Sequence, residues 1–158
     1  MTDMDRPEAV AAMLSAADAH GMTVTVRERP AADSLPEAAA ILGVTPADIA
    51  KTLVVKRAIA SYVFVVVPGD RTIAWPKLRA ALGVNRLSLP DASEAYDATG
   101  YERGTITPIG AAHPWPVVVD STLTGRRVAM GAGAHGFSAF VDVDELVSGY
   151  DGTVADVT

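Results

Sequence analysis

The sequence contains no cysteine among its 158 residues. Disulfides, thiolate metal sites and a cysteine nucleophile are therefore excluded, and the absence fits a reducing compartment. Long apolar runs are missing too: the run from Tyr62 to Val67 is far too short to cross a membrane, and the N-terminal residues lack the apolar segment of a signal peptide. These features predict a soluble, cytoplasmic protein without a membrane partner.

Conventional catalytic patterns are equally scarce. The three histidines, His20, His113 and His135, are scattered and form no H-E-x-x-H motif, so we expect no metal and no cofactor. Ser121 and Ser138 lack the G-x-S-x-G pattern of a nucleophile elbow. The sequence therefore does not predict hydrolysis through a serine, a cysteine or a metal-bound water.

Helical and strand patterns alternate along the chain, and no linker or repeat divides it, so we expect a single domain over residues 1–158. Capping residues and apolar spacing predict helices that begin near Asp5, Ser34, Thr45, Pro76, Asp91 and Asp142. Apolar and β-branched runs predict strands at 23–28, 52–57, 62–67, 71–75, 86–89, 117–120, 127–130 and 139–141. The short Ala58-Ile-Ala connection favours a hairpin. The expected fold is α+β with a mixed, partly antiparallel sheet.

Charge is unevenly distributed along the chain. The net charge is −6, yet residues 49–90 hold seven basic residues and one acidic residue. The basic residues are Lys51, Lys56, Arg57, Arg71, Lys77, Arg79 and Arg86. Gathered on one face, they would form a footprint for a phosphate backbone. Paired with acidic helices, they would be ordinary surface salt bridges, and the sequence leaves both interpretations open.

The most informative stretch is the loop Gly104-Thr-Ile-Thr-Pro108, which carries no ionisable side chain. Gly104 can adopt a positive φ and admit another molecule close to the main chain, and Pro108 keeps the preceding residue extended. The N–H groups of Thr105, Ile106 and Thr107 then lack helical partners, so they could donate to a carbonyl or ribose oxygen of a ligand. A plain surface turn is the alternative.

Lys51 opens the apolar run Lys51-Thr-Leu-Val-Val. Side chains two residues apart in a strand share a face, so Lys51 lies on the side of Leu53 and Val55. If that side faces the core, the ammonium sits at its rim, where it can meet a phosphate or hydroxyl at the mouth of a pocket. The alternative is a lysine that extends past the strand end into water.

Four motifs follow one another along the chain: Lys51-Thr-Leu-Val-Val, Thr99-Gly-Tyr with Gly104-x-x-x-Pro108, Pro116-Val-Val-Val-Asp120, and Gly131-Ala-Gly133-Ala-His135-Gly136. Together they resemble the YbaK family of aminoacyl-tRNA deacylases, whose domain is also inserted into bacterial prolyl-tRNA synthetases as the editing domain. The resemblance runs from about Val24 to about Ser148. It implies a curved mixed β-sheet or barrel flanked by helices.

The resemblance further implies a trans-editing hydrolase that cleaves the ester of a mischarged aminoacyl-tRNA and removes a small amino acid from the tRNA 3′ end. Lys51 and Gly104 would be the catalytic residues. The loop at Gly104 would orient the ester and stabilise its developing oxyanion, and Lys51 would hold the terminal nucleotide or its phosphate. Neither a protein nucleophile nor a general base from the protein is required in that scheme.

The residues expected to contact the substrate are Thr105, Ile106, Thr107, Pro108, Asp120, Gly133 and His135. Ala134-His135 stands where relatives resembling bacterial Cys-tRNA deacylases have two basic residues, so cysteine specificity does not transfer and the amino acid stays unassigned. The expected partners are the acceptor end of an aminoacyl-tRNA and, transiently, a synthetase, with no DNA. Two alternatives stay open: a non-catalytic RNA-end or nucleotide-binding module of the same fold, and an accessory that docks on a synthetase.

Overall fold

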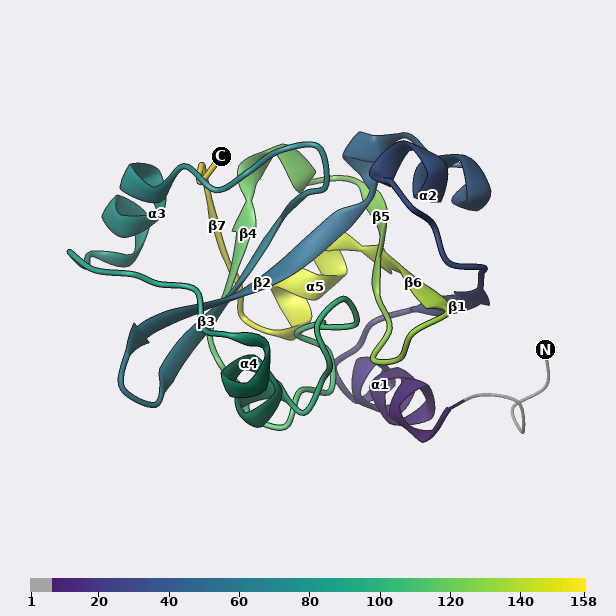
Figure 1. Ribbon diagram of the computed structural model, residues 1–158, viewed down its shortest axis with the longest axis horizontal. Helices are drawn as coiled ribbons and strands as arrows, with labels where there is room; N and C mark the ends of the chain where they lie inside the picture. The colour runs from purple at the N-terminus through teal and green to yellow at the C-terminus, as the bar shows by residue number, and fades with distance from the viewer. Residues whose placement is uncertain (1–6) are drawn as a thin grey trace.

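The computed structural model describes residues 7–158, which form two β-sheets flanked by helices (Figure 1). One sheet is antiparallel, in the order β1 (Thr25–Glu28), β6 (Phe137–Asp142) and β5 (Arg127–Gly131). The other is mixed, in the order β2 (Ala50–Ala58), β3 (Ser61–Pro68), β4 (Val117–Asp120) and β7 (Thr153–Ala155). The α+β prediction is confirmed, and the two sheets do not close into a barrel.

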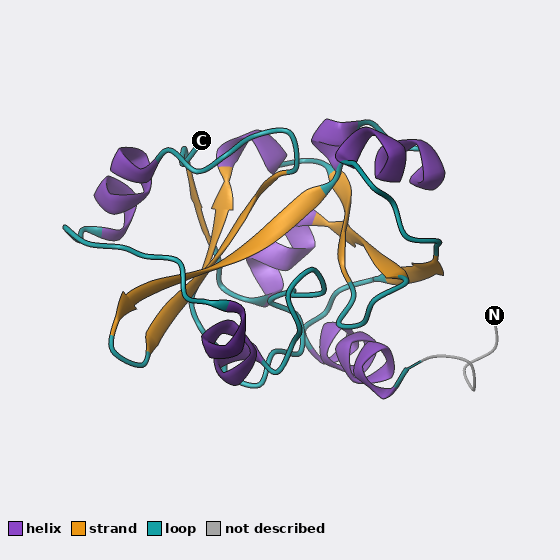
Figure 2. Cartoon of the chain, viewed as in Figure 1, coloured by secondary structure: helices purple, strands orange, loops and turns teal. Residues whose placement is uncertain are grey.

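Helices lie around both sheets (Figure 2). They are α1 (Glu8–Ala19), α2 (Leu35–Leu42), α3 (Trp75–Leu82), α4 (Ala92–Thr99) and α5 (Val143–Gly149), with the 3-10 turns η2 (Pro46–Asp48) and η3 (Ser121–Leu123). The side chains of Ser34, Asp91 and Asp142 each accept a hydrogen bond from a first-turn backbone N–H, as the capping patterns predict. Asp5, the predicted start of α1, lies outside the described residues.

Two hydrophobic clusters lie on opposite faces of the mixed sheet. The larger cluster includes Phe64 and Val66 of β3 and extends to α1, α5 and the antiparallel sheet. The smaller cluster includes Val65 of β3 and Leu78 of α3. Because successive side chains of a strand alternate between faces, β3 is buried on both sides and reads as the continuous apolar run seen in the sequence.

Two predicted strands are wrong, and one strand was not predicted. Residues 71–74 form no strand and α3 begins at Trp75, because within residues 7–158 the one backbone hydrogen bond from this segment to the C-terminal residues runs from the N–H of Ala74 to the carbonyl of Val157, at 2.8 Å. Residues 86–89 contribute an isolated bridge from Ser88 to Lys56. Strand β7 has three residues with no apolar alternation, so its pairing with β4 leaves no signal in the local sequence.

Asp120 ends β4 and is fully buried. Its carboxylate accepts hydrogen bonds from the backbone N–H and hydroxyl of Thr122, and from the backbone N–H of Val157 at 3.0 Å. Burial raises the pKa of Asp120, but these hydrogen bonds outweigh burial and hold the pKa below its usual value. The carboxylate therefore ties the C-terminal segment to the mixed sheet.

We expect Asp120→Ala to lower the free energy of unfolding by about 2–3 kcal/mol, because buried N–H groups lose a charged acceptor. Asp120→Asn keeps one acceptor oxygen and should lose less. Since the folded-state pKa is depressed, this stabilisation is fully present above the unfolded value of about 3.8 and is lost as the pH falls through the folded-state pKa. Urea unfolding at several pH values checks both points.

The matched control is Asp156→Asn, which removes an exposed carboxylate that pairs with Lys77 on the surface and should change stability little. The difference in unfolding free energy between wild type and Asp120→Asn should narrow on acidification. A difference that stays constant down to the acid transition would contradict the assigned role of the carboxylate.

Candidate active site

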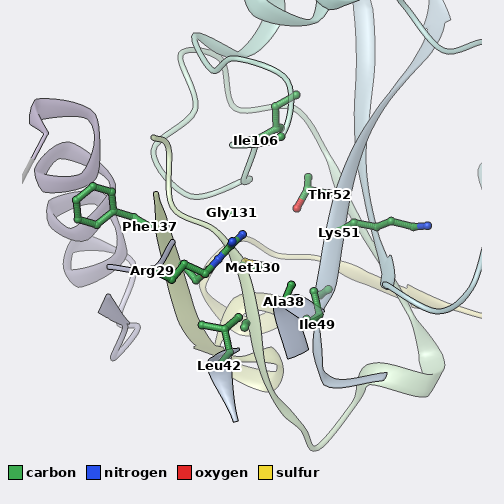
Figure 3. A pocket seen from close by; sticks show the side chains of 14 residues that line it. Arg29, Ala38, Leu42, Ile49, Lys51, Thr52, Ile106, Met130, Gly131 and Phe137 are labelled. Carbon is green, nitrogen blue, oxygen red and sulfur yellow. The ribbon is translucent and has the colours of Figure 1, made fainter. Parts of the chain in front are cut away.

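A cavity of about 210 Å³, called here the first cavity, opens between α2, the start of β2, the Gly104 loop (residues 104–108), the end of β5 and the start of β6 (Figure 3). Its wall is largely apolar and includes Ala38, Leu42, Ile49, Met130 and Phe137. Polar groups enter from Arg29, Lys51, Thr52 and Ser138. Such a wall, apolar with a few polar groups, is typical of a site for a small organic group.

Gly104 lies exposed at this cavity and has a φ of +90°, so the positive φ predicted from the sequence is confirmed. A Cβ placed on Gly104 would meet only Cε1 of His135, at 3.7 Å, which is an ordinary contact. The protein itself therefore leaves the space beside Gly104 open. A side chain there would occupy room that a ligand can use to approach the backbone.

The amides of the Gly104 loop fall into two groups. Both donors of Thr105 are used within the protein: its N–H and its hydroxyl donate to the carbonyl of Glu102, at 3.0 and 2.7 Å. The N–H groups of Gly104, Ile106 and Thr107 have no acceptor within residues 7–158. The N–H of Thr105, although it has no helical partner, is thus not available to a ligand, whereas Gly104 and Ile106 both line the cavity.

Gly131, the last residue of β5, and Gly133, in the turn between β5 and β6, hold this loop by backbone contact. The N–H of Gly133 donates to the carbonyl of Thr105 at 3.0 Å. A Cβ on Gly131 would lie 2.6 Å from the carbonyl oxygen of Ile106, and one on Gly133 would lie 2.9 Å from Cε1 of Tyr101. Gly133 does not line the cavity. It supports the loop and is not part of the cavity wall.

Thr107 and Pro108 are buried behind the cavity wall. The hydroxyl of Thr107 lies 3.7 Å from the sulfur of Met130 and accepts a hydrogen bond from the N–H of Ile109 at 3.3 Å. Side chains alternate along this extended loop, so Ile106 turns toward the cavity while Thr105 and Thr107 turn inward. The side chains predicted at Thr105, Thr107 and Pro108 to contact a substrate therefore do not line the first cavity.

Neighbouring residues of β2 point to opposite sides of the strand. Thr52 points toward the first cavity, and Lys51 points away from it (Figure 3). Its ammonium forms no ion pair within residues 7–158. A second cavity of about 310 Å³ shares Lys51, Thr52, Gly104 and Ile106 with the first and continues along β2. Lys51 thus stands between the two cavities.

Asp120 and His135 also lie outside the wall of the first cavity. Contrary to the expectation, Asp120 does not line the pocket, because it lies in β4, two strands away from β2, and its buried carboxylate is used by Thr122 and Val157. His135 is exposed beside Gly104, and its Nε2 lies 3.0 Å from Oε2 of Glu102. His135 therefore flanks the mouth without entering the cavity.

Arg29 is a cavity residue that the sequence did not reveal. It follows β1, its Nε donates to the hydroxyl of Ser138 at 2.8 Å, and one terminal nitrogen donates to the carbonyl of Pro30 at 3.2 Å. Its side chain points into the cavity (Figure 3). Ser138 lies 109 positions away along the chain, so no local pattern distinguishes this arginine from a surface arginine.

Two basic residues of the middle segment form the predicted surface salt bridges. Lys56 pairs with Glu94 at 2.8 Å, and Lys77 pairs with Asp156 at 3.0 Å. Within residues 7–158, no ion pair forms at Lys51, Arg57, Arg71, Arg79 or Arg86. In the same part of the chain, no cluster of His, Asp and Glu is arranged to hold a metal, and no helix has the length and apolarity to cross a bilayer.

Comparison with known proteins identifies the fold. The proline–tRNA ligase of Bacillus licheniformis is 31% identical over 81 residues, which cover 51% of this chain and 14% of the ligase. A crystallised hypothetical protein has a TM-score of 0.84 at 30% identity, covering 92% of this chain and 98% of that one. A proposed trans-editing enzyme for prolyl-tRNA synthetase has a TM-score of 0.86 at 23% identity, covering 98% and 99%.

The sequence family extends over most of the chain. Residues 29–148 match the aminoacyl-tRNA editing domain, and this range contains the Gly104 loop, Lys51 and every residue that lines the first cavity. The resemblance inferred from the four motifs is confirmed. The chain belongs to the aminoacyl-tRNA editing domain family.

Proposed function

We propose that this chain hydrolyses the ester that joins a mischarged amino acid to the 3′-terminal ribose of a tRNA, acting in trans and releasing a small amino acid. Membership of the editing family supports the substrate class. The observation that carries the reaction is the Gly104 loop, in which Gly104 and Ile106 line an apolar cavity and their N–H groups have no acceptor within residues 7–158. Backbone donors held in place in this way are suited to an oxyanion.

The reaction needs few side chains. Water adds to the ester carbonyl, negative charge develops on the carbonyl oxygen, and the ribose oxygen leaves with the proton that the water gives up. One backbone N–H directed at that developing charge is worth roughly 3 kcal/mol, and an ester is already activated toward hydrolysis. The loop therefore contributes by orientation and charge stabilisation, and a nucleophile from the protein is not needed.

The first cavity would receive the amino acid, since its apolar wall of Leu42, Ile49 and Phe137 suits a small side chain. Lys51, on the other side of β2 from Thr52, would meet a phosphate of the terminal nucleotide outside the cavity. Ile106 would close the wall between the ester and the adenosine. His135 would flank the mouth.

A panel of tRNAs charged with alanine, cysteine, serine and proline tests the proposal. We expect release of at least one small non-cognate amino acid well above the rate in buffer, with the pattern of rates reporting the fit to the first cavity. Tight binding of charged tRNA without release would favour the non-catalytic RNA-end module of the same fold. If the protein neither binds charged tRNA nor releases an amino acid from it, both functions are refuted.

Gly104→Ala should lower kcat/KM by about 30- to 1000-fold, equivalent to about 2–4 kcal/mol, because the new Cβ displaces the ester from the loop amides. Alanine at a φ of +90° is also strained, so the melting temperature should fall. Gly136→Ala is the matched control, with a φ of +84° and its nearest neighbour at 3.9 Å. It carries the same strain without lining the cavity. Equal activity in the two variants would refute the backbone mechanism.

Lys51→Ala should lower kcat/KM for charged tRNA by about tenfold or more, through loss of one phosphate contact. The melting temperature should hardly change, because the ammonium has no ion pair within residues 7–158. Lys77→Ala, which removes a lysine paired with Asp156 on the surface, serves as control. An unchanged rate in the Lys51 variant would remove this residue from the site.

A further inference from the structure

β2 is the outer strand of the mixed sheet, and most of its outer edge is unpaired within the described chain. Bridges to other segments occur only at Ile49 and at Lys56. At Lys56 the pairing is reciprocal with Ser88, at 2.8 and 3.1 Å. Main-chain groups two residues apart point the same way, so Thr52 and Val54 direct their N–H and C=O groups to this open side, where they line the second cavity.

Two cavities lie along this edge, one on each side of the bridge from Ser88 to Lys56. The second cavity lies between β2 and the segment from Leu89 to Ala92, and a third cavity of about 350 Å³ lies between residues 56–59 and residues 86–88. The chain that joins α3 to α4 crosses the β2–β3 hairpin here (Figure 1), and the bridge from Ser88 to Lys56 holds it against the strand. We call the second and third cavities together the β2 groove.

The β2 groove is strongly basic in a chain whose net charge is −6. Its lining carries five basic residues and one acidic residue, namely Lys51, Lys56, Arg57, Arg86 and Arg103 against Asp91. Lys56 is neutralised by Glu94, and the other four basic residues form no ion pair within residues 7–158. The edge at β2 therefore carries a concentration of positive charge, most of which forms no ion pair within residues 7–158.

Exposed apolar side chains stand among these cations. Ile59 is 92% exposed at the hairpin tip, and Leu89 is 55% exposed in the second cavity. A basic groove that follows the backbone is one feature of a site for single-stranded nucleic acid. Ile59 and Leu89 add apolar surface beside these cations, although no aromatic residue of the described chain lines either cavity. A peptide added to the β2 edge would use the same main-chain groups but would not need four unpaired cations.

We propose that the β2 groove binds the single-stranded 3′ end of the tRNA upstream of the ester, an inference that rests on the proposed function. The second cavity shares Lys51, Thr52, Gly104 and Ile106 with the first, so a strand in the groove leads directly to the ester position. From Thr52 to Arg57 the strand advances roughly 17 Å, the reach of a few nucleotides. The terminal adenosine lies in the second cavity, and upstream phosphates meet Arg57 and Arg86.

The test compares two substrates and two double variants. The substrates are an aminoacylated minihelix, which is an acceptor stem with its 3′ overhang, and the aminoacyl-adenosine, which ends before the upstream phosphates. Arg57→Gln with Arg86→Gln changes the groove. Arg71→Gln with Arg79→Gln removes two arginines of the same basic segment that line neither cavity of the groove.

We expect the groove double variant to lower kcat/KM for the minihelix by about tenfold or more. The slope of log kcat/KM against log salt concentration should become shallower by roughly 1.4, because each phosphate contact on a single strand contributes about 0.7. The rate on aminoacyl-adenosine should be far less affected, since that substrate does not reach the hairpin tip. The control double variant should resemble wild type on both substrates.

Equal losses on the minihelix and the aminoacyl-adenosine, equal losses in the two double variants, or an unchanged salt slope would each overturn the proposal. If wild type hydrolyses neither substrate, the proposed function fails by itself. The groove is then tested by fluorescence anisotropy with the uncharged minihelix. Binding that weakens in the groove variant but not in the control supports the groove, and equal binding in both overturns it.

Discussion

The candidate site depends on one backbone contact, the hydrogen bond from the N–H of Gly133 to the carbonyl of Thr105 at 3.0 Å. The Gly104 loop has no charged side chain that could anchor it, so main-chain groups must hold it in place. Gly131 permits the close approach, because a Cβ there would lie 2.6 Å from the carbonyl oxygen of Ile106. Thr105 is fixed on both its N–H and its C=O, and this fixes the neighbouring amides of Gly104 and Ile106, which have no acceptor within residues 7–158.

The cavity exists because the two sheets meet beside this loop. A bridge from Ile49 to Ala129 brings the start of β2 against β5. Arg27 of β1 then donates to the carbonyls of Ile41 and Leu42, at 3.1 and 3.2 Å, which satisfies the C-terminal end of α2. That contact holds Leu42 in the cavity wall. The apolar wall is thus assembled from a helix end, a strand start and a loop, each fixed by its own hydrogen bonds.

The sequence predicted those features that neighbouring residues determine, such as helix starts, a hairpin and a backbone conformation. Capping residues such as Ser34 and Asp91 marked helix starts, and the β2–β3 hairpin followed from two apolar runs with a short turn. The positive φ of Gly104 followed from the Gly-x-x-x-Pro unit. Residues that depend on distant partners could not be predicted this way. Arg29 finds Ser138 across 109 positions, and Asp120 finds the N–H of Val157 across 37.

Asp120 shows why sequence reasoning misplaced one site residue. An acidic residue after a buried strand looks the same whether it faces a ligand or caps its own chain, since both uses need a carboxylate at a strand end. The distinction lies in which donors surround it, and the C-terminal segment that supplies one of them carries no capping or strand pattern. Side-chain identity was informative here, but the direction of the side chain was set by tertiary contacts.

Under the proposed function, the division of charge would orient the molecule toward RNA. An acidic surface repels a polyanion, so a net charge of −6 disfavours loose association over most of the protein. In the proposed complex, the cations of the β2 groove that form no ion pair within residues 7–158 would attract the RNA along one edge, beside the Gly104 loop. Repulsion elsewhere and attraction at the groove would act together, because like-charge contact penalises wrong orientations while opposite charge increases encounters in the right one. The Gly104 loop, which has no ionisable side chain, would then need no charge of its own to recruit the proposed substrate, and its amides would stabilise the charge that develops during the proposed reaction.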